Sequence, residues 1–319
     1  DFCLSRGLGD VYKRQALDNS KKYAWMPISD KLYYVNGSDS KNILYTVDPE
    51  TLAEQVLVRD IPAGNFRFTY DEKSLLYTES EAPDPQKGDL VLISTPENRQ
   101  PDANTRYFIS RYNLQTGIKE RLTYGKNSAR INDLSRDSRY LLFSTSEYTP
   151  TVRPFFSSSL YMMDLQTLAI DTIWSDQYFV SSASFSPDGK SLLIEGSGEA
   201  FGGIGKKVKD GQIPNSYNGL AFIMDLVSRK VDPITKSFDP SVDYAVWNHT
   251  DGQIYLGVTD KDYQRVYRYN PKSRQFVQLQ LVEDVVRSMD FSEGSNWAAY
   301  IGLSASNSTK AYTLSLIHI

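Results

Sequence analysis

Two groups of charged residues are the first candidates for binding chemistry in this sequence. Glu79 and Glu81 stand two residues apart in YTESEAP, and Glu147 precedes Arg153 in SEYTPTVRPFF. Carboxylates and a guanidinium at the start of a loop have the chemistry to hold the charged end of a substrate. Charged residues in loops are more often simply solvated. The sequence therefore leaves the substrate-binding residues unknown.

Nucleophilic hydrolysis needs an activated serine, a histidine base and an acid that orients the histidine. His249 lies in a turn, NHTDG, where a histidine is more often structural or exposed than catalytic. The G-x-S-x-G pattern that presents a nucleophilic serine occurs nowhere in the chain. We therefore predict no catalytic residue in this sequence.

A cluster of glycines, GSGEAFGGIGKK, invites a comparison with phosphate-binding loops. Lys207 stands where that motif requires serine or threonine, and no helical pattern follows. We interpret residues 196–219 as a mobile loop. The sequence also lacks a cysteine pair, a histidine cluster and a calcium-loop pattern, so we predict no metal site and no cofactor.

The elements that would position such residues are visible as a repeated phrase. FSPDGKSLLIEG, which begins at Phe185, is echoed by TYDEKSLLYTES, LSRDSRYLLFSTS and WNHTDGQIYLGVTD. ISDKLYYVNG and FSEGSNWAAYIG are weaker copies. Each copy has a polar turn with Asp or Gly, followed by a short apolar run. In FSPDGKSLLIEG, we expect Asp188 and Gly189 to form the turn, Phe185 to be buried, and residues 192–194 to be a buried strand.

A second phrase follows the first one. It consists of an apolar strand, an Asp or Asn, two residues, a Thr or Ser, and another strand. Its anchors are Asp48, Asn113, Asp164, Asp225 and Asn270. A short side chain that accepts hydrogen bonds from its own backbone is typical of the first position of a tight turn. The pattern predicts antiparallel hairpins.

The two phrases alternate with a period that indicates the fold. Taking Asp30, Asp71, Asp137, Asp188, Asp251 and Gly294 as markers, the spacings are 41, 66, 51, 63 and 43 residues. Repeats of about 40 to 50 residues with four strands each are typical of β-propeller blades. We predict an all-β propeller of four-stranded antiparallel blades, with about six blades present. Two inserts, residues 80–105 and 196–219, follow the second strand of their modules. The segment VEDVVRSM hints at a helical turn.

Composition and the two ends of the chain narrow the interpretation. A net charge of −4 does not favour nucleic acid as a partner, and no apolar run is long enough to span a bilayer. Residues 1–15 and residues 314–319, LSLIHI, resemble translated sequencing-adaptor read-through on metagenomic gene fragments. We expect both segments to be non-native, together with Cys3 and His318. The propeller is then expected at residues 16–313, as part of a natural protein that continues at both ends.

The alternation of FSPDGKSLL with LYMMDLQT and RYNLQTGIKERLT resembles the N-terminal propeller of the prolyl oligopeptidase (S9) family of serine peptidases. Within this family, the dipeptidyl-peptidase and acylaminoacyl-peptidase-like branch of Bacteroides-type bacteria is the most similar. TolB-like propellers share the same phrases.

The resemblance implies seven or eight blades, truncated here, and a C-terminal α/β-hydrolase domain that carries the catalytic residues and is absent from this chain. The propeller would admit short peptides to that domain, in the bacterial periplasm or cell envelope. The glutamate-pair motif of dipeptidyl-peptidase-IV-type enzymes has no match, so no site residue is carried over. The alternative is a TolB-like or other propeller that binds a ligand or a protein and has no enzyme attached.

Overall fold

The computed structural model describes residues 21–38, 41–63, 65–84, 88, 90, 93, 104–209, 211–212 and 216–318, without the side chains of Ser38 and His318. The segment 1–15, with Cys3, lies outside these residues, as does Ile319. The chain divides into two compact units, residues 1–130 and 131–319, and each is described by itself.

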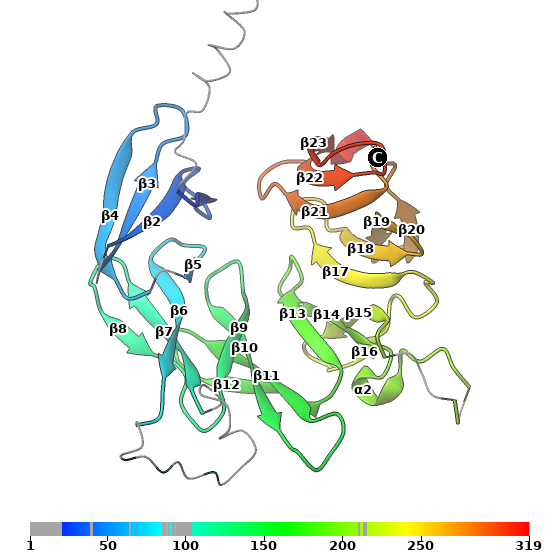
Figure 1. Ribbon diagram of the computed structural model, residues 1–319, viewed down its shortest axis with the longest axis horizontal. Coiled ribbons are helices and arrows are strands. Elements are labelled where there is room, and N and C mark those ends of the chain that lie inside the picture. Colours follow the sequence, from blue (N-terminus) through cyan, green and yellow to red (C-terminus); the bar gives the residue numbers. More distant parts are fainter. Residues whose placement is uncertain are drawn as a thin grey trace, which may run out of the picture. The chain divides into compact units, whose positions relative to one another are not determined.

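The first unit contains two four-stranded antiparallel blades (Figure 1). The first blade consists of β1 (Ala24–Trp25), β2 (Leu32–Ser38), β3 (Lys41–Val47) and β4 (Glu54–Ile61). The second consists of β5 (Phe66–Phe68), β6 (Ser74–Glu81), β7 (Arg106–Asn113) and β8 (Lys119–Arg121). In both blades the strands follow one another in space as they do in the sequence.

The second unit continues this order. The third blade has β9 (Ala129–Leu134), β10 (Tyr140–Tyr148), β11 (Phe156–Asp164) and β12 (Ile170–Gln177). The fourth has β13 (Val180–Phe185), β14 (Ser191–Ser197), β15 (Gly219–Asp225) and β16 (Val231–Asp232), with a short helix, α2 (Ala200–Gly203), after its second strand. Together with the last two blades, described next, these blades confirm the predicted propeller fold of about six blades.

The last two blades are joined into one sheet. They comprise β17 (Ser241–Trp247), β18 (Ile254–Asp260), β19 (Tyr263–Asn270) and β20 (Gln275–Gln278), then β21 (Val285–Phe291), β22 (Trp297–Leu303) and β23 (Lys310–Ser315). A single parallel pair, Gln264 with Val285, links β19 to β21. A 3-10 helix, Leu316–His318, follows β23. The helical turn expected in VEDVVRSM was wrong, because its β-branched residues extend into β21.

The turn between the first and second strands of a blade, the 1–2 turn, repeats one hydrogen-bond pattern. In the fourth blade, the Ser186 hydroxyl donates to the Asp188 carboxylate at 2.7 Å, and the Lys190 amide donates to the same oxygen at 3.1 Å. Gly189 has a φ of +67°. Phe185 and residues 192–194 are buried. The expected hairpin is confirmed.

The turn between the third and fourth strands, the 3–4 turn, repeats a second pattern. Its first residue accepts hydrogen bonds from backbone amides two or three residues later, at 2.7 to 3.2 Å, in Asp48, Asn113, Asp164, Asp225 and Asn270. Its fifth residue has a positive φ in every case, in Leu52, Gly117, Leu168, Arg229 and Arg274. These hydrogen bonds hold the pKa values of Asp48, Asp164 and Asp225 below their usual range.

The hydrophobic core of each unit lies between neighbouring blades. In the first unit, Leu44 of the first blade packs with Leu75 and Tyr77 of the second. In the second unit, Leu142 and Leu160 pack with Phe222 of the next blade, and similar clusters join the fourth to the fifth blade and the fifth to the sixth. Both faces of the middle strands are therefore buried, which explains why runs such as SLLIE do not alternate with polar residues.

Candidate functional site

The structure gives Glu79 and Glu81 a partner within their own blade. Arg121 lies 3.6 Å from the Glu79 carboxylate and 3.1 Å from that of Glu81. Ser110 and Tyr77 also donate to Glu79, at 2.8 and 3.1 Å. Burial and the hydrogen bond to Glu79 raise the pKa of Tyr77 to about 12. The two carboxylates thus connect β6 to the neighbouring strand β7 through Ser110, and to β8 through Arg121.

Glu147 and Arg153 belong to the hairpin between β10 and β11. Glu147 lies opposite Ser157 on the neighbouring strand. The Arg153 guanidinium lies 5.5 Å from the centre of the Phe155 ring.

His249 lies in the 1–2 turn of the fifth blade, where its side chain is exposed. Partial burial lowers its pKa, and Arg136 lowers it further, while Glu293 and Asp133 act in the opposite direction. Arg136 and Glu293 form an ion pair with each other. In the part of the chain that the structure describes, no serine hydroxyl is hydrogen-bonded to His249.

The glycine-rich segment after β14 is more structured than we expected. Phe201 packs edge-on against Trp174 and Phe222, at centroid distances of 5.5 and 5.8 Å, and Ala200 is fully buried. Lys236 donates to the carbonyl of Ile204 at 2.8 Å. An aromatic anchor within the glycines thus packs the first part of this segment between two blades, whereas residues 206–209 are exposed. Residues 210 and 213–215 lie outside the described residues.

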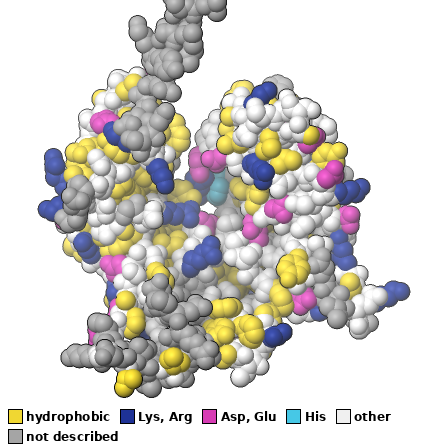
Figure 2. Space-filling view, viewed as in Figure 1, with side chains coloured by type: hydrophobic (Ala, Val, Ile, Leu, Met, Phe, Trp, Pro, Cys, Tyr) yellow, Lys and Arg dark blue, Asp and Glu magenta, His cyan; other side chains and the backbone are white. Residues whose placement is uncertain are grey.

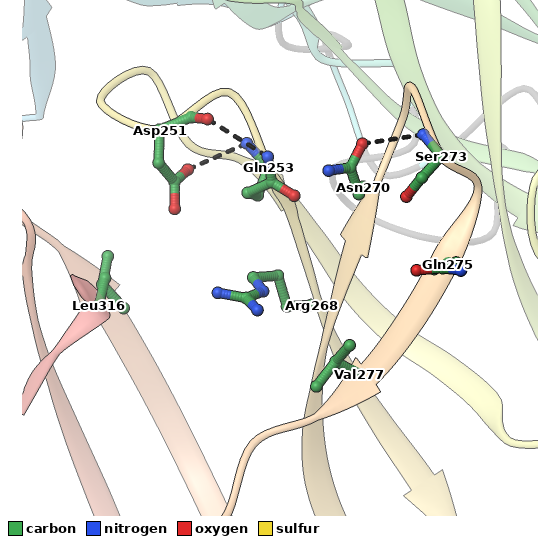
Figure 3. A pocket seen from close by; sticks show the side chains of 8 residues that line it. All are labelled: Asp251, Gln253, Arg268, Asn270, Ser273, Gln275, Val277 and Leu316. Atoms are coloured by element: carbon green, nitrogen blue, oxygen red, sulfur yellow. Dashed lines mark hydrogen bonds between the residues drawn. The ribbon is translucent and has the colours of Figure 1, made fainter. Parts of the chain in front are cut away.

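A cavity of about 340 Å³ lies beside the fifth blade in the second unit (Figure 3). Its walls come from the 1–2 turn, from β19, from the 3–4 turn and β20, and from the start of the last 3-10 helix. The lining residues are Asp251, Gln253, Arg268, Asn270, Ser273, Gln275, Val277 and Leu316. Most of them carry hydrogen-bonding groups, while Val277 and Leu316 supply an apolar part.

The cavity contains two charged side chains, Asp251 and Arg268, which differ in their hydrogen-bond partners. Asp251 accepts hydrogen bonds from the Tyr255 hydroxyl at 2.7 Å and from the Gln253 amide at 2.9 Å. Burial and this bond to Asp251 raise the pKa of Tyr255, and the nearby Arg268 partly offsets the rise. In Figure 3 the Arg268 guanidinium projects into the space between Asp251, Val277 and Leu316. The cavity therefore offers a cation to a ligand.

Our reading of the sequence missed this cavity. Arg268 stands two residues before the anchor Asn270, a position that aligning the repeats would have marked. Among the described residues, no group of three His, Cys, Asp or Glu side chains is placed to hold a metal ion. On the face shown in Figure 2, acidic, basic and hydrophobic side chains are all present on both units. No described helix has the length and apolar character needed to cross a membrane.

The sequence matches no protein-family model, and a search of curated proteins finds no relative. Solved structures do resemble the fold. Acylaminoacyl peptidase from Pyrococcus horikoshii aligns over 92% of this chain with a TM-score of 0.61 and 12% identity. This chain spans 43% of that peptidase.

Two further solved structures resemble this chain. The propeller domain of the trilobed protease from Pyrococcus furiosus aligns over 92% of this chain and 80% of its own, with a TM-score of 0.57 and 13% identity. Oligogalacturonate lyase from Vibrio parahaemolyticus aligns over 95% of this chain and 78% of its own, with a TM-score of 0.64 and 11% identity. At such identities the likeness identifies the fold, and the chain is a β-propeller similar to those of S9-type peptidases.

Proposed function

We propose that this propeller is the substrate gate of a serine peptidase of the prolyl oligopeptidase type. In this proposal, an α/β-hydrolase domain of the same protein carries the catalytic serine, aspartate and histidine. The propeller admits short peptides to that domain and keeps folded proteins out. Specificity for dipeptide release, and a Bacteroides-type source, remain expectations from the resemblance.

One observation carries the proposal. The likeness to acylaminoacyl peptidase covers 92% of this chain but 43% of the peptidase, as expected if this chain corresponds to one domain of a larger enzyme. The surroundings of His249 agree with this division of labour. Its charged neighbours are Arg136, Glu293 and Asp133, and burial and Arg136 lower the pKa of the imidazole. We therefore expect the chemistry to come from the hydrolase domain.

The test compares this chain with the longer natural protein recovered from the same DNA. Both would be assayed on short peptide p-nitroanilides, on peptides of increasing length, and on casein. We expect no turnover by this chain, and turnover by the longer protein that falls with peptide length. Replacing the serine of its G-x-S-x-G motif with alanine should abolish activity.

Two outcomes would contradict the proposal. One is peptide hydrolysis by this chain when it is pure. The other is a downstream sequence that encodes no G-x-S-x-G motif followed by aspartate and histidine. A length-independent rate in the longer protein would keep the peptidase but remove the gate.

The second candidate is a propeller that binds a ligand without a peptidase domain. The cavity beside Arg268 favours it, since a polar pocket lies within the propeller itself. The likeness to oligogalacturonate lyase, which covers 78% of that chain, is also consistent with a propeller that works without a hydrolase domain. The downstream sequence distinguishes the two candidates.

We also propose that the protein acts in the bacterial periplasm or cell envelope, as the family resemblance implies. Fractionation of cells that express the complete natural gene tests this. Recovery of the protein in the cytoplasmic fraction would contradict it.

A further inference from the structure

Arg268 occupies a position that recurs in the blades of this chain. It stands two residues before the anchor of its 3–4 turn and pairs across the hairpin with Val277. In the second blade, Arg111 stands at the same position and pairs across its hairpin with Glu120. The two hairpins thus hold the same cation at the same place, opposite different neighbours.

The position opposite is acidic in three blades. It is Glu120 in the second blade, Asp171 in the third and Asp232 in the fourth. Among the five hairpins that the structure describes, that of the fifth blade alone combines an arginine with an apolar residue there, and the first blade pairs Thr46 with Gln55. In the second blade the arginine at this position lies opposite a carboxylate. In the fifth blade the arginine is kept, but the residue opposite it is valine.

The consequence is visible in the contacts of the two arginines. Arg111 donates to the Glu120 carboxylate from two nitrogens, at 2.5 and 3.1 Å. Arg268 makes no ion pair with any residue in the described ranges, and its described contact is with the hydroxyl of Tyr255. A guanidinium has five N–H donors arranged to bind a carboxylate through two hydrogen bonds. Most of these donors remain available in Arg268.

The space that a carboxylate would need is also present. The cavity of about 340 Å³ opens at this point, and Val277 is 44% exposed toward solvent. Gln253, Ser273 and Gln275 line it with amide and hydroxyl groups that can bind the polar atoms next to a carboxylate. Its volume lies near the lower end of the range for small-molecule pockets, which suits a ligand about the size of a dipeptide.

We propose that this cavity binds the carboxylate of a small polar molecule, which takes the place beside Arg268 that Glu120 holds beside Arg111. Asp251 sets a limit on the ligand. Its negative charge lies in the same cavity, already satisfied by Tyr255 and Gln253, so a second carboxylate on the ligand would be repelled. The ligand class is therefore a monocarboxylate with hydrogen-bonding groups near the acid. The free carboxyl end of a short peptide and a small hydroxy acid both have this chemistry.

The test is titration calorimetry on this chain with three probes. They are N-acetyl-glycyl-alanine, the same peptide with an amidated carboxyl end, and glycerate. We expect the acetylated peptide or glycerate, or both, to bind, and the amide to bind at least tenfold more weakly, because charge-assisted hydrogen bonds to arginine are lost. Which of the two acids binds more tightly identifies the source of the carboxylate.

Two variants locate the site. Arg268→Gln removes the cation and should weaken binding at least tenfold. Val277→Glu rebuilds the pair of the second blade, so its own carboxylate should occupy Arg268 and displace the ligand, while thermal melting shows the protein still folded. Arg265→Gln is the matched control. It lies on the same strand three residues away, on the opposite face, where Arg265 pairs with Asp260 at 2.9 Å. Binding by this variant should stay within about twofold.

Three results would overturn the proposal. One is equal affinity for the acid and the amide of the peptide. Another is unchanged binding by Arg268→Gln or by a folded Val277→Glu. The third is that neither acid binds at concentrations up to about 10 mM, because a working site is expected to have a Kd below that concentration.

Discussion

Acidic residues join neighbouring blades of the second unit in two places. The two kinds of contact differ in what the carboxylate binds and in how exposed it is to solvent. One kind lies at the first strand of a blade, where a carboxylate accepts a hydrogen bond from a backbone amide. The other lies at the fourth strand, where a carboxylate pairs with an arginine. Both contacts link residues about 40 to 60 positions apart in the sequence.

At the first strands, the carboxylates satisfy amides that the sheets leave unpaired. β13 and β17 each pair with one strand only, so amides on their other edge need an acceptor. Asp133 accepts from the Phe185 amide at 2.8 Å, and Glu195 accepts from the Ala245 amide at 2.7 Å. Phe185 is buried, so water cannot easily replace its acceptor.

At the fourth strands, the ion pairs face solvent. Arg229 pairs with Asp171 at 2.5 Å, and Arg274 pairs with Asp232 at 2.7 Å. The Arg274 and Asp232 side chains are 59% and 40% exposed. Exposed pairs gain little because water competes for both charges. The comparison indicates that the first-strand contacts contribute more to stability than the fourth-strand pairs do.

The largest effect is expected from Glu195→Ala. This change removes the acceptor of the Ala245 amide between the fourth and fifth blades. Because this amide is only partly buried, we expect a loss near the lower end of the about 1 to 3 kcal/mol that an unpaired buried donor costs. Urea unfolding followed by circular dichroism measures the free energy of unfolding. Glu50→Ala, in an exposed turn, is the control, and an equal loss in both variants would contradict the comparison.

An intermediate effect is expected from pH. Burial raises the pKa of Glu195, and its hydrogen bonds with the Ala245 amide and Ser182 only partly oppose the rise. A carboxyl group with a raised pKa in the folded state contributes stability that is full below its unfolded pKa and is lost as pH rises through the folded pKa. Glu195→Gln keeps an oxygen acceptor and does not titrate. The stability of the wild type relative to this variant should therefore fall as the pH rises above about 4. Parallel stability curves for the two proteins would show that Glu195 titrates normally.

The smallest effect is expected at the fourth strands. Arg274→Gln should cost less than about 1 kcal/mol, and the loss should shrink in 1 M salt, since screening removes most of an exposed pair's attraction. The measurement is urea unfolding at low and high salt. A loss that matches Glu195→Ala, or one that is independent of salt, would remove the distinction between the two kinds of contact.

The sequence was most informative where a structure depends on residues close together in the chain. The turn at Asp188 and Gly189 and the burial of residues 192–194 follow from short-range chemistry, and both are confirmed. Glu195 stood in the same phrase, but its role could not be predicted. Its partner is a backbone amide 50 residues away, and the sequence does not reveal which backbone amides lack a partner within their own sheet.

The cavity was hidden for a related reason. Arg268 and Val277 become neighbours only when the cross-strand register of the hairpin is known. Phe201 shows the opposite failure, because the glycines around it suggested mobility, whereas the fold packs its ring between two others. Aligning the blades with one another would have found Arg268, but no alignment of repeats gives the volume beside it.

The fifth residue of the 3–4 turn has a consequence for how these blades diverge from one another. Gly117 takes the left-handed conformation without strain, whereas Arg229 and Arg274 adopt it, with φ of 59° and 58°, at a cost of roughly 1 kcal/mol each. Each arginine uses that side chain to reach an aspartate of the preceding blade. A change of such an arginine to glycine would relax its own turn and release the neighbour in the same step. A mutation to glycine at this position therefore removes a link between two blades, while the relaxed turn offsets part of the lost stability.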